Sequence, residues 1–114
     1  MTTHVRYEHR HLDVVCDLNA AEQGARAAEW RRLLDSAGLD VTRVDGGARL
    51  WLRPGAAAAA EDLIRREAGC CGFLDFELTT DGDRLRLDIT SVASCGDEIA
   101  AALAGLRSEG CGKC

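Results

Sequence analysis

The chain of 114 residues contains six cysteines, and their spacing could support thiolate chemistry. Cys70 and Cys71 are adjacent, and Cys111 and Cys114 form a CxxC pair around Lys113 at the C-terminus. Thiolates are preferred ligands of soft metal ions, and they also bind Zn²⁺. The N-terminal residues lack the apolar stretch of a signal peptide, so we expect a cytoplasmic protein with reduced thiols. In that setting cysteines are predicted metal ligands or redox groups, not a disulfide framework.

The adjacent cysteines have two interpretations. Neighbouring cysteines rarely bond to each other, because the ring that results strains the peptide bond between them. A chain turn at Gly72 could instead direct both thiols, Cys70 and Cys71, to one metal ion. Alternatively they are small core residues, since they follow Leu63 and Ile64 by seven positions in a predicted helix.

Cys95 is the strongest candidate for a reactive or metal-capturing thiolate. Ser94 and Asp97 predict a capped helix start, which places Cys95 in the first helical turn. Free amide N–H groups and the helix dipole lower a thiol pKa there, although Asp97 and Glu98 oppose this effect. The alternative is a small residue that fills a tight cap.

The remaining cysteines divide between a core position and an exposed arm. Cys16 is expected in the core, unless the fold brings it beneath Cys70 and Cys71. Cys111 and Cys114 suit a mobile arm that collects metal ions, or else a tail without a role.

Four polar residues are weaker candidates. His9 and His11 share one face of an extended segment and could chelate an ion, although a solvated face is the simpler expectation. Asp75 and Glu77 point away from the core beside the double cysteine. Asp75 could donate a proton or an oxygen ligand, and surface solvation is the alternative for both carboxylates.

The elements that position these residues follow from periodicity and turn signals. Alternation over 11–17 predicts a strand, and Asn19 with Glu22 predicts a capped helix that ends at Ala37 before Gly38. Asp-Gly turns at 45–46 and 81–82 predict two hairpins, separated by a helix over 56–70. The order β-α-β-β-α-β-β-α predicts one α+β domain over 1–108, with a mostly antiparallel sheet and helices on one face. Residues 109–114 are the predicted mobile tail.

Several function classes are excluded by composition and motifs. A net charge of −5 with scattered basic residues argues against nucleic-acid binding. No apolar run approaches the roughly 20 residues that span a bilayer. Phosphate-binding glycine loops, HExxH and serine nucleophile elbows are absent from the sequence, which argues against ordinary kinase and hydrolase chemistry.

The segment from Glu67 to Leu78 reads EAGCCGFLDFEL, and a charged Asp-Gly hairpin follows it. It resembles small bacterial proteins with a Glu-x-x-Cys-Cys-x-Phe-x-x-Phe core, which are associated with MerR-type metal regulators and mercury-resistance settings. The similarity covers residues 12–92. It implies a soft-metal or organomercurial context for Cys70 and Cys71, whereas Cys95 and the C-terminal pair lie outside it.

The leading interpretation is a thiolate protein for soft heavy metals, acting in detoxification, sequestration or transfer without an organic cofactor. Mercury or an organomercurial is the first expected guest, followed by Cu(I), Zn²⁺ or Cd²⁺. The C-terminal pair would capture the ion and pass it to Cys70, Cys71 and Cys95. Expected partners are a metal-responsive regulator or reductase, and a second copy of the chain.

Two alternatives remain open from the sequence. One is a thiol enzyme that cleaves organomercurials, with Cys95 among its thiolates and Asp75 as the proton donor. The other is a thiol-disulfide redox or sensing protein that pairs Cys95 with another cysteine.

Overall fold

The computed structural model describes residues 2–106, and the elements within them follow the predicted order. They are β1 (His4–Tyr7), α1 (Ala20–Ala37), β2 (Gly38–Val44), β3 (Gly47–Leu52), a short 3₁₀ turn (Pro54–Ala56), α2 (Ala57–Cys70), β4 (Asp75–Asp81), β5 (Arg84–Thr90) and α3 (Gly96–Leu103). The predicted α+β class and the predicted order of strands and helices are confirmed.

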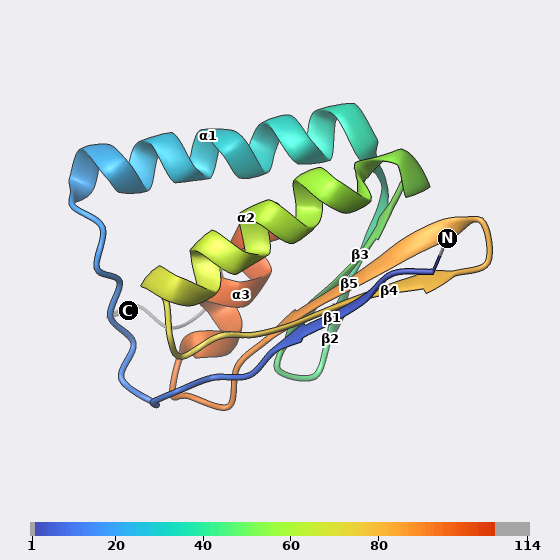
Figure 1. The fold of residues 1–114 in the computed structure, drawn as a ribbon. Helices are drawn as coiled ribbons and strands as arrows, with labels where there is room; N and C mark the ends of the chain where they lie inside the picture. The colour runs from blue at the N-terminus through green and yellow to red at the C-terminus, as the bar shows by residue number, and fades with distance from the viewer. Residues whose placement is uncertain (1, 107–114) are drawn as a thin grey trace.

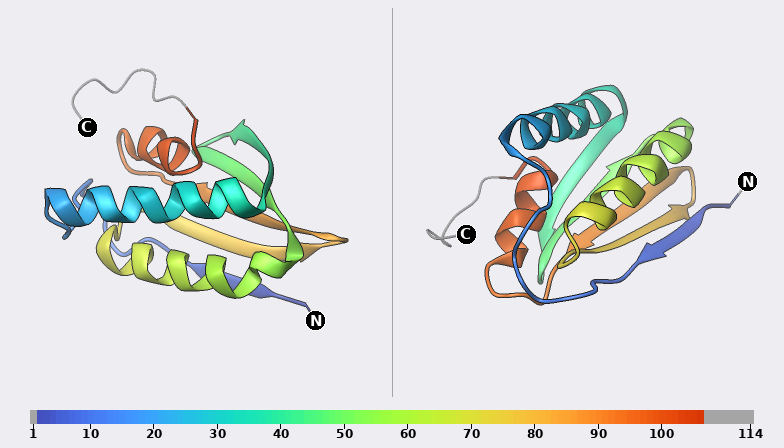
Figure 2. Two further views of the ribbon diagram at one scale, coloured as in Figure 1. Left: turned by 90° about the horizontal axis from the view of Figure 1, so that it is seen from above. Right: turned by 60° about the vertical axis from the view of Figure 1, so that its left-hand side comes forward.

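The strands form one antiparallel sheet in the order β1-β4-β5-β3-β2. All three helices lie on the same side of this sheet, with α1 farthest from it (Figure 1; Figure 2). Inward residues of the strands, such as Leu50, Leu78 and Leu87, pack against Leu63 and Ile64 of α2 in one buried core. The apolar residues that the alternation predicts to point inward are therefore the ones that face the core.

The first strand differs from the prediction. Residues 11–17 form no strand, and the edge strand is β1, which pairs with β4 from His4 opposite Thr79 to Tyr7 opposite Phe76. The segment lies against the domain without a partner strand, and a bond of 2.9 Å from the Val15 N–H to the Asp13 carbonyl turns the chain tightly. Val14 and Cys16 are half-buried, whereas Leu12 is 57% exposed.

Backbone hydrogen bonds hold this N-terminal segment, residues 8–19, against the end of α2. The Arg10 N–H donates to the Gly72 carbonyl at 2.7 Å, and the Asp17 N–H donates to the Cys70 carbonyl at 3.2 Å. The Arg10 guanidinium adds a bond of 3.0 Å to the Ala68 carbonyl, one of the helix-end acceptors. The segment is thereby fixed next to both adjacent cysteines.

The helix ends follow the sequence signals in one case and depart from them in two. Asn19 and Glu22 form the predicted capping box, with both side chain-to-backbone bonds at 2.9 Å. Gly38 does not take a left-handed C′ conformation, because it continues directly into β2 with extended angles. Ser94 is not the cap of α3. Cys95 occupies that position with φ of 67°, and its side chain forms no capping bond.

Replacing Gly47 by alanine is expected to destabilise the protein by about 1–3 kcal/mol, the usual cost of overpacking. A Cβ at Gly47 would lie 2.0 Å from the Ile89 carbonyl oxygen and 3.0 Å from the Ala100 Cβ. Denaturant unfolding measures the change. Gly24→Ala in α1 is the matched control, since no atom lies within 4 Å of its added Cβ and the helix gains propensity. Equal effects of the two substitutions would contradict the expected clash.

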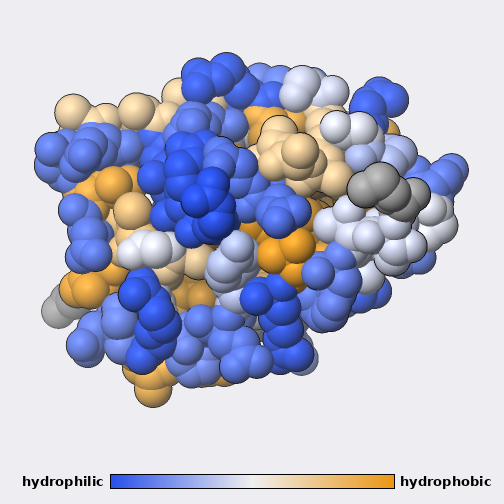
Figure 3. All heavy atoms as spheres, viewed as in Figure 1, coloured by the Kyte–Doolittle hydropathy of each residue, from blue (hydrophilic) through white to orange (hydrophobic). Residues whose placement is uncertain are grey.

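The surface in the orientation of Figure 3 is mostly hydrophilic, with hydrophobic side chains visible between charged ones. Within residues 2–106 the most exposed large apolar side chain is that of Val92, at 72%, and Leu12 and Val15 follow at 57% and 55%. Among the residues described, no helix combines the length and apolar character required to cross a membrane.

Candidate metal centre

Two thiols and one carboxylate converge between the N-terminal segment and α2. The Sγ atoms of Cys16 and Cys71 and a carboxylate oxygen of Glu67 all lie within 4.8 Å of one another. The Cys71 Sγ is 2.9 Å from the Cys16 Sγ and 3.2 Å from the Glu67 Oε2. Within residues 2–106, this thiol–carboxylate cluster is the only group of three such donors that could hold a metal ion.

The end of α2 supplies two of the three donors. Glu67 and Cys71 are four positions apart, so they lie on one side of the last helical turn. The Cys71 N–H completes that turn with a 2.8 Å bond to the Glu67 carbonyl, and Cys71 is the C-cap residue. Cys16 comes from 55 positions earlier in the chain. The bond between the Asp17 N–H and the Cys70 carbonyl, at 3.2 Å, holds it there.

The Glu67 carboxylate is almost fully buried, at 2% exposure, and its charge is compensated by two groups of α1. The Trp30 Nε1–H donates to Oε1 at 2.6 Å, and the Arg26 Nη1 lies 3.5 Å from Oε2. A buried carboxylate requires such partners, because removal from water without them is costly. The cluster therefore contains an oriented acceptor that faces a thiol.

Burial raises the pKa of the Cys71 thiol well above its usual range. The hydrogen bond with Cys16 and the negative charge of Glu67 raise this pKa further. Without a cation, Cys71 is therefore a neutral thiol at neutral pH. A bound metal ion would replace the proton and offset the Glu67 charge, and two sulfurs with one oxygen match the ligand preferences of thiophilic ions and Zn²⁺.

A cavity of about 440 Å³ adjoins the cluster. Cys16, Glu67 and Cys71 form part of its wall, and Arg26 lines it as well. The rest is largely apolar, with side chains from the N-terminal segment, from α3 and from the residues before β4, including Val14, Leu18, Phe73, Ile99 and Leu103. Because both cysteines line this cavity, a small guest in it could reach both sulfur atoms.

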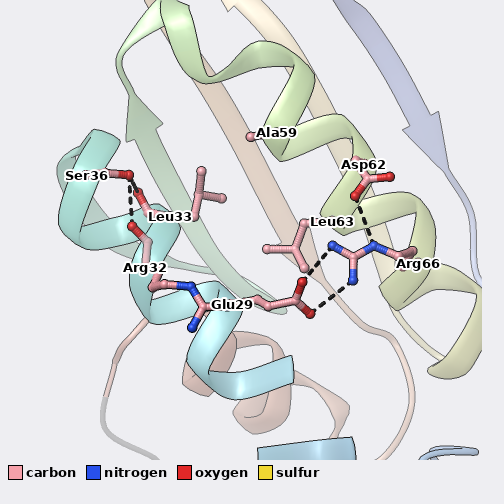
Figure 4. A pocket seen from close by; sticks show the side chains of 8 residues that line it. All are labelled: Glu29, Arg32, Leu33, Ser36, Ala59, Asp62, Leu63 and Arg66. Atoms are coloured by element: carbon pink, nitrogen blue, oxygen red, sulfur yellow. Dashed lines mark hydrogen bonds and ion pairs between the residues drawn. The ribbon is translucent and has the colours of Figure 1, made fainter. Parts of the chain in front are cut away.

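A second hollow of about 290 Å³ between α1 and α2 has a different character (Figure 4). Arg66 on α2 bonds to Glu29 on α1 at 2.9 Å and to Asp62 at 3.0 Å. The hydrogen bond from Arg66 holds the pKa of Glu29 below its usual value. Because these charges pair with one another, this hollow is an ion-pair contact between the helices that support the cluster.

The structure separates the two adjacent cysteines. Cys71 belongs to the cluster, whereas the half-buried Cys70 has its Sγ 4.0 Å from the Arg26 Nη2 and is not among the three donors. Cys95, at the start of α3, is disulfide-bonded, so its sulfur is not available as a thiolate in this structure. Cys111 and Cys114 lie outside the residues that the structure describes.

Two of the four weaker polar candidates, His9 and Asp75, pair with each other, and a third, Glu77, pairs with His4. The Asp75 carboxylate accepts hydrogen bonds from the His9 N–H at 2.7 Å and lies 3.0 Å from the His9 Nδ1. Glu77 bonds to the His4 Nε2 at 3.1 Å, and this bond lowers its pKa. None of these groups belongs to the cluster described above. His11 is likewise not one of its donors.

Two of the cluster's three donors were not among the site residues predicted from the sequence. Glu67 had a usable signal, because it precedes Cys71 by four positions in a predicted helix and opens the quoted motif. The prediction for Cys16 was conditional on the fold bringing it beneath the double cysteine. The fold brings Cys16 next to Cys71, and the backbone bonds of the N-terminal segment hold it there.

Comparisons of the chain with protein-family models, with curated proteins and with solved structures gave no match.

Proposed function

We propose that the protein binds a soft, thiophilic metal ion at the thiol–carboxylate cluster and serves in the sequestration or transfer of heavy metals. The observation that supports this most directly is the approach of the Cys16 and Cys71 sulfurs to 2.9 Å beside the buried Glu67. Distant parts of the chain supply these donors, and backbone bonds hold them together without a covalent link.

Mercury is the first candidate among the ions. Soft ions of low coordination number need only two thiolates, and Cys16 and Cys71 supply two. Cu(I) has the same preference, whereas Zn²⁺ and Cd²⁺ would need Glu67 and a further ligand to complete four-coordination. The resemblance of residues 67–78 to proteins of mercury-resistance settings supports this order. The apolar cavity beside the sulfurs would also accommodate the organic group of an organomercurial.

In this proposal the C-terminal pair, Cys111 and Cys114, captures the ion when all six cysteines are reduced and delivers it to Cys16 and Cys71. Cys70 lies one residue from the cluster and can serve as an exchange partner during delivery. A metal-responsive regulator or a reductase would then receive the ion from the protein.

Anaerobic titration of the reduced protein with Hg²⁺, Cu(I), Cd²⁺ and Zn²⁺ tests the proposal. The background carries Cys95→Ser, Cys111→Ser and Cys114→Ser, so that only Cys16, Cys70 and Cys71 contribute thiols to the reading. Native mass and ligand-to-metal charge-transfer absorption should show one ion bound per chain. The Cys16→Ser/Cys71→Ser double variant should lose this ion.

Cys70→Ser is the matched control, because it removes a neighbouring thiol and leaves the cluster intact. It should retain the ion. If the double variant binds metal as tightly as its parent, or if Cys70→Ser abolishes binding, the proposed site is wrong.

A further inference from the structure

We propose that Cys16 and Cys71 also form a reversible disulfide, which makes the cluster an oxidation-sensitive site and removes its capacity for metal. The bridge itself follows from the geometry of the two sulfurs. The release of metal on oxidation rests on the proposed function.

The separation of the sulfurs is the first argument. Both thiols are free, and their Sγ atoms are 2.9 Å apart. A disulfide bond is roughly 2.0 Å long, so closure needs an approach of about 1 Å. Cys16 lies in the N-terminal segment 8–19, which has no helix or strand and can shift more easily than the core.

The surroundings of Cys71 also favour a disulfide with Cys16 over one with Cys70. A bond between adjacent Cys70 and Cys71 would strain the intervening peptide. The Cys70 Sγ lies instead 4.0 Å from the Arg26 Nη2. Of the described cysteines, only Cys16 and Cys71 have sulfurs within hydrogen-bonding distance of each other, so oxidation should join these two.

The solvent exposure of the two cysteines indicates which one the oxidant reaches first. Cys71 is 6% exposed, whereas Cys16 is half-buried and lines the 440 Å³ cavity. A small hydroperoxide therefore meets Cys16 first. The Cys16 sulfur attacks one peroxide oxygen, the O–O bond breaks, and the thiol proton leaves with the other oxygen as water or alcohol. The Cys71 thiol then passes its proton to the Glu67 carboxylate, 3.2 Å away, and its sulfur attacks the sulfur of the Cys16 sulfenic acid. The S–S bond forms as the S–O bond breaks, and the leaving hydroxide takes the proton from Glu67 and departs as water.

Metal binding and the disulfide exclude each other, because both use the same two sulfurs. Oxidation would release the bound ion, and a thiol reductant would restore the site. Conversely, a bound ion would protect Cys16 and Cys71 from the oxidant. The cluster would thus couple metal retention to the supply of peroxide.

The test is treatment of the metal-free, reduced full chain with hydrogen peroxide, followed by alkylation and non-reducing peptide mapping. The expected product is a peptide pair joined through Cys16 and Cys71, in the wild type and in Cys70→Ser alike. Dithiothreitol should reverse it, and one prebound Cd²⁺ per chain should suppress it at least tenfold. If Cys16 and Cys71 remain alkylatable while bridges form between other cysteines, the inference is wrong.

The two proposals fail separately. If the bridge forms but the reduced protein binds no metal, the proposed function is lost together with the metal-release step, and the disulfide stands. If metal binds but no bridge joins Cys16 to Cys71, the disulfide is rejected and the metal site stands. Cys16→Ser serves as a second check, because in it peroxide should leave Cys71 reduced.

Discussion

Raising the pH from about 6 to about 8 is expected to increase the affinity of the protein for Cd²⁺ at least ~100-fold. Burial beside Cys16 and Glu67 raises the pKa of Cys71, so this thiol carries its proton throughout that range. A metal ion must displace the proton before it can bind the sulfur. Each displaced proton makes the association constant rise about tenfold per pH unit. Competition with a chelator of known proton affinity measures the slope.

The Cys71→Ser variant tests whether the pH dependence of metal affinity comes from the Cys71 proton or from other charged groups of the protein. The variant should lose about one proton from the pH slope, and its affinity at neutral pH should fall by more than about 100-fold, since loss of even an outer-shell partner costs 10–100-fold. Cys70→Ser should keep the wild-type slope. An affinity that is the same at both pH values would show that Cys71 is not a ligand.

The fold was largely predictable because its patterns are local. The residues of β5 alternate between apolar and charged side chains, and Asn19 and Glu22 form the capping box that the sequence indicates. The alternation at 11–17 was misleading, because Val14 and Cys16 are half-buried in a segment that pairs with no strand, and Leu12 is exposed. The true edge strand, His4–Tyr7, does alternate, with Val5 and Tyr7 half-buried against the core, but it has only four residues, so its signal is weak.

The site was predictable only in part, because its geometry depends on tertiary contacts. Cys70 is the last residue of α2 and Cys71 is its C-cap, with a φ of −118°, so the sequence does not indicate the relative directions of their side chains. Which of them faces the other donors depends on how α2 packs. The contribution of Cys16 depends on backbone bonds between Asp17 and Cys70 and between Arg10 and Gly72, for which the sequence carries no separate signal.

Trp30→Ala is expected to destabilise the metal-free protein by about 3–5 kcal/mol, and Trp30→Phe by about 1–3 kcal/mol. Trp30 is 2% exposed and stacks on Phe76, with ring centroids 6.4 Å apart. Its Nε1–H is also the closest hydrogen-bond donor to the buried Glu67, at 2.6 Å. Alanine removes both contributions, whereas phenylalanine retains the stack and removes only the donor. Urea unfolding, followed by far-UV circular dichroism, measures both changes.

The contribution of the Trp30 N–H donor to stability can be measured separately with a second substitution and a control. Trp51→Phe on the open sheet face removes an indole whose ring lies 4.2 Å from the Arg84 guanidinium, and it should cost less than about 1 kcal/mol. Glu67→Leu should make Trp30→Phe much less costly, because no buried carboxylate then lacks its partner. If Trp30→Phe costs the same with and without Glu67, the indole does not stabilise the carboxylate. The metal ligand would then depend on Arg26 alone for its orientation.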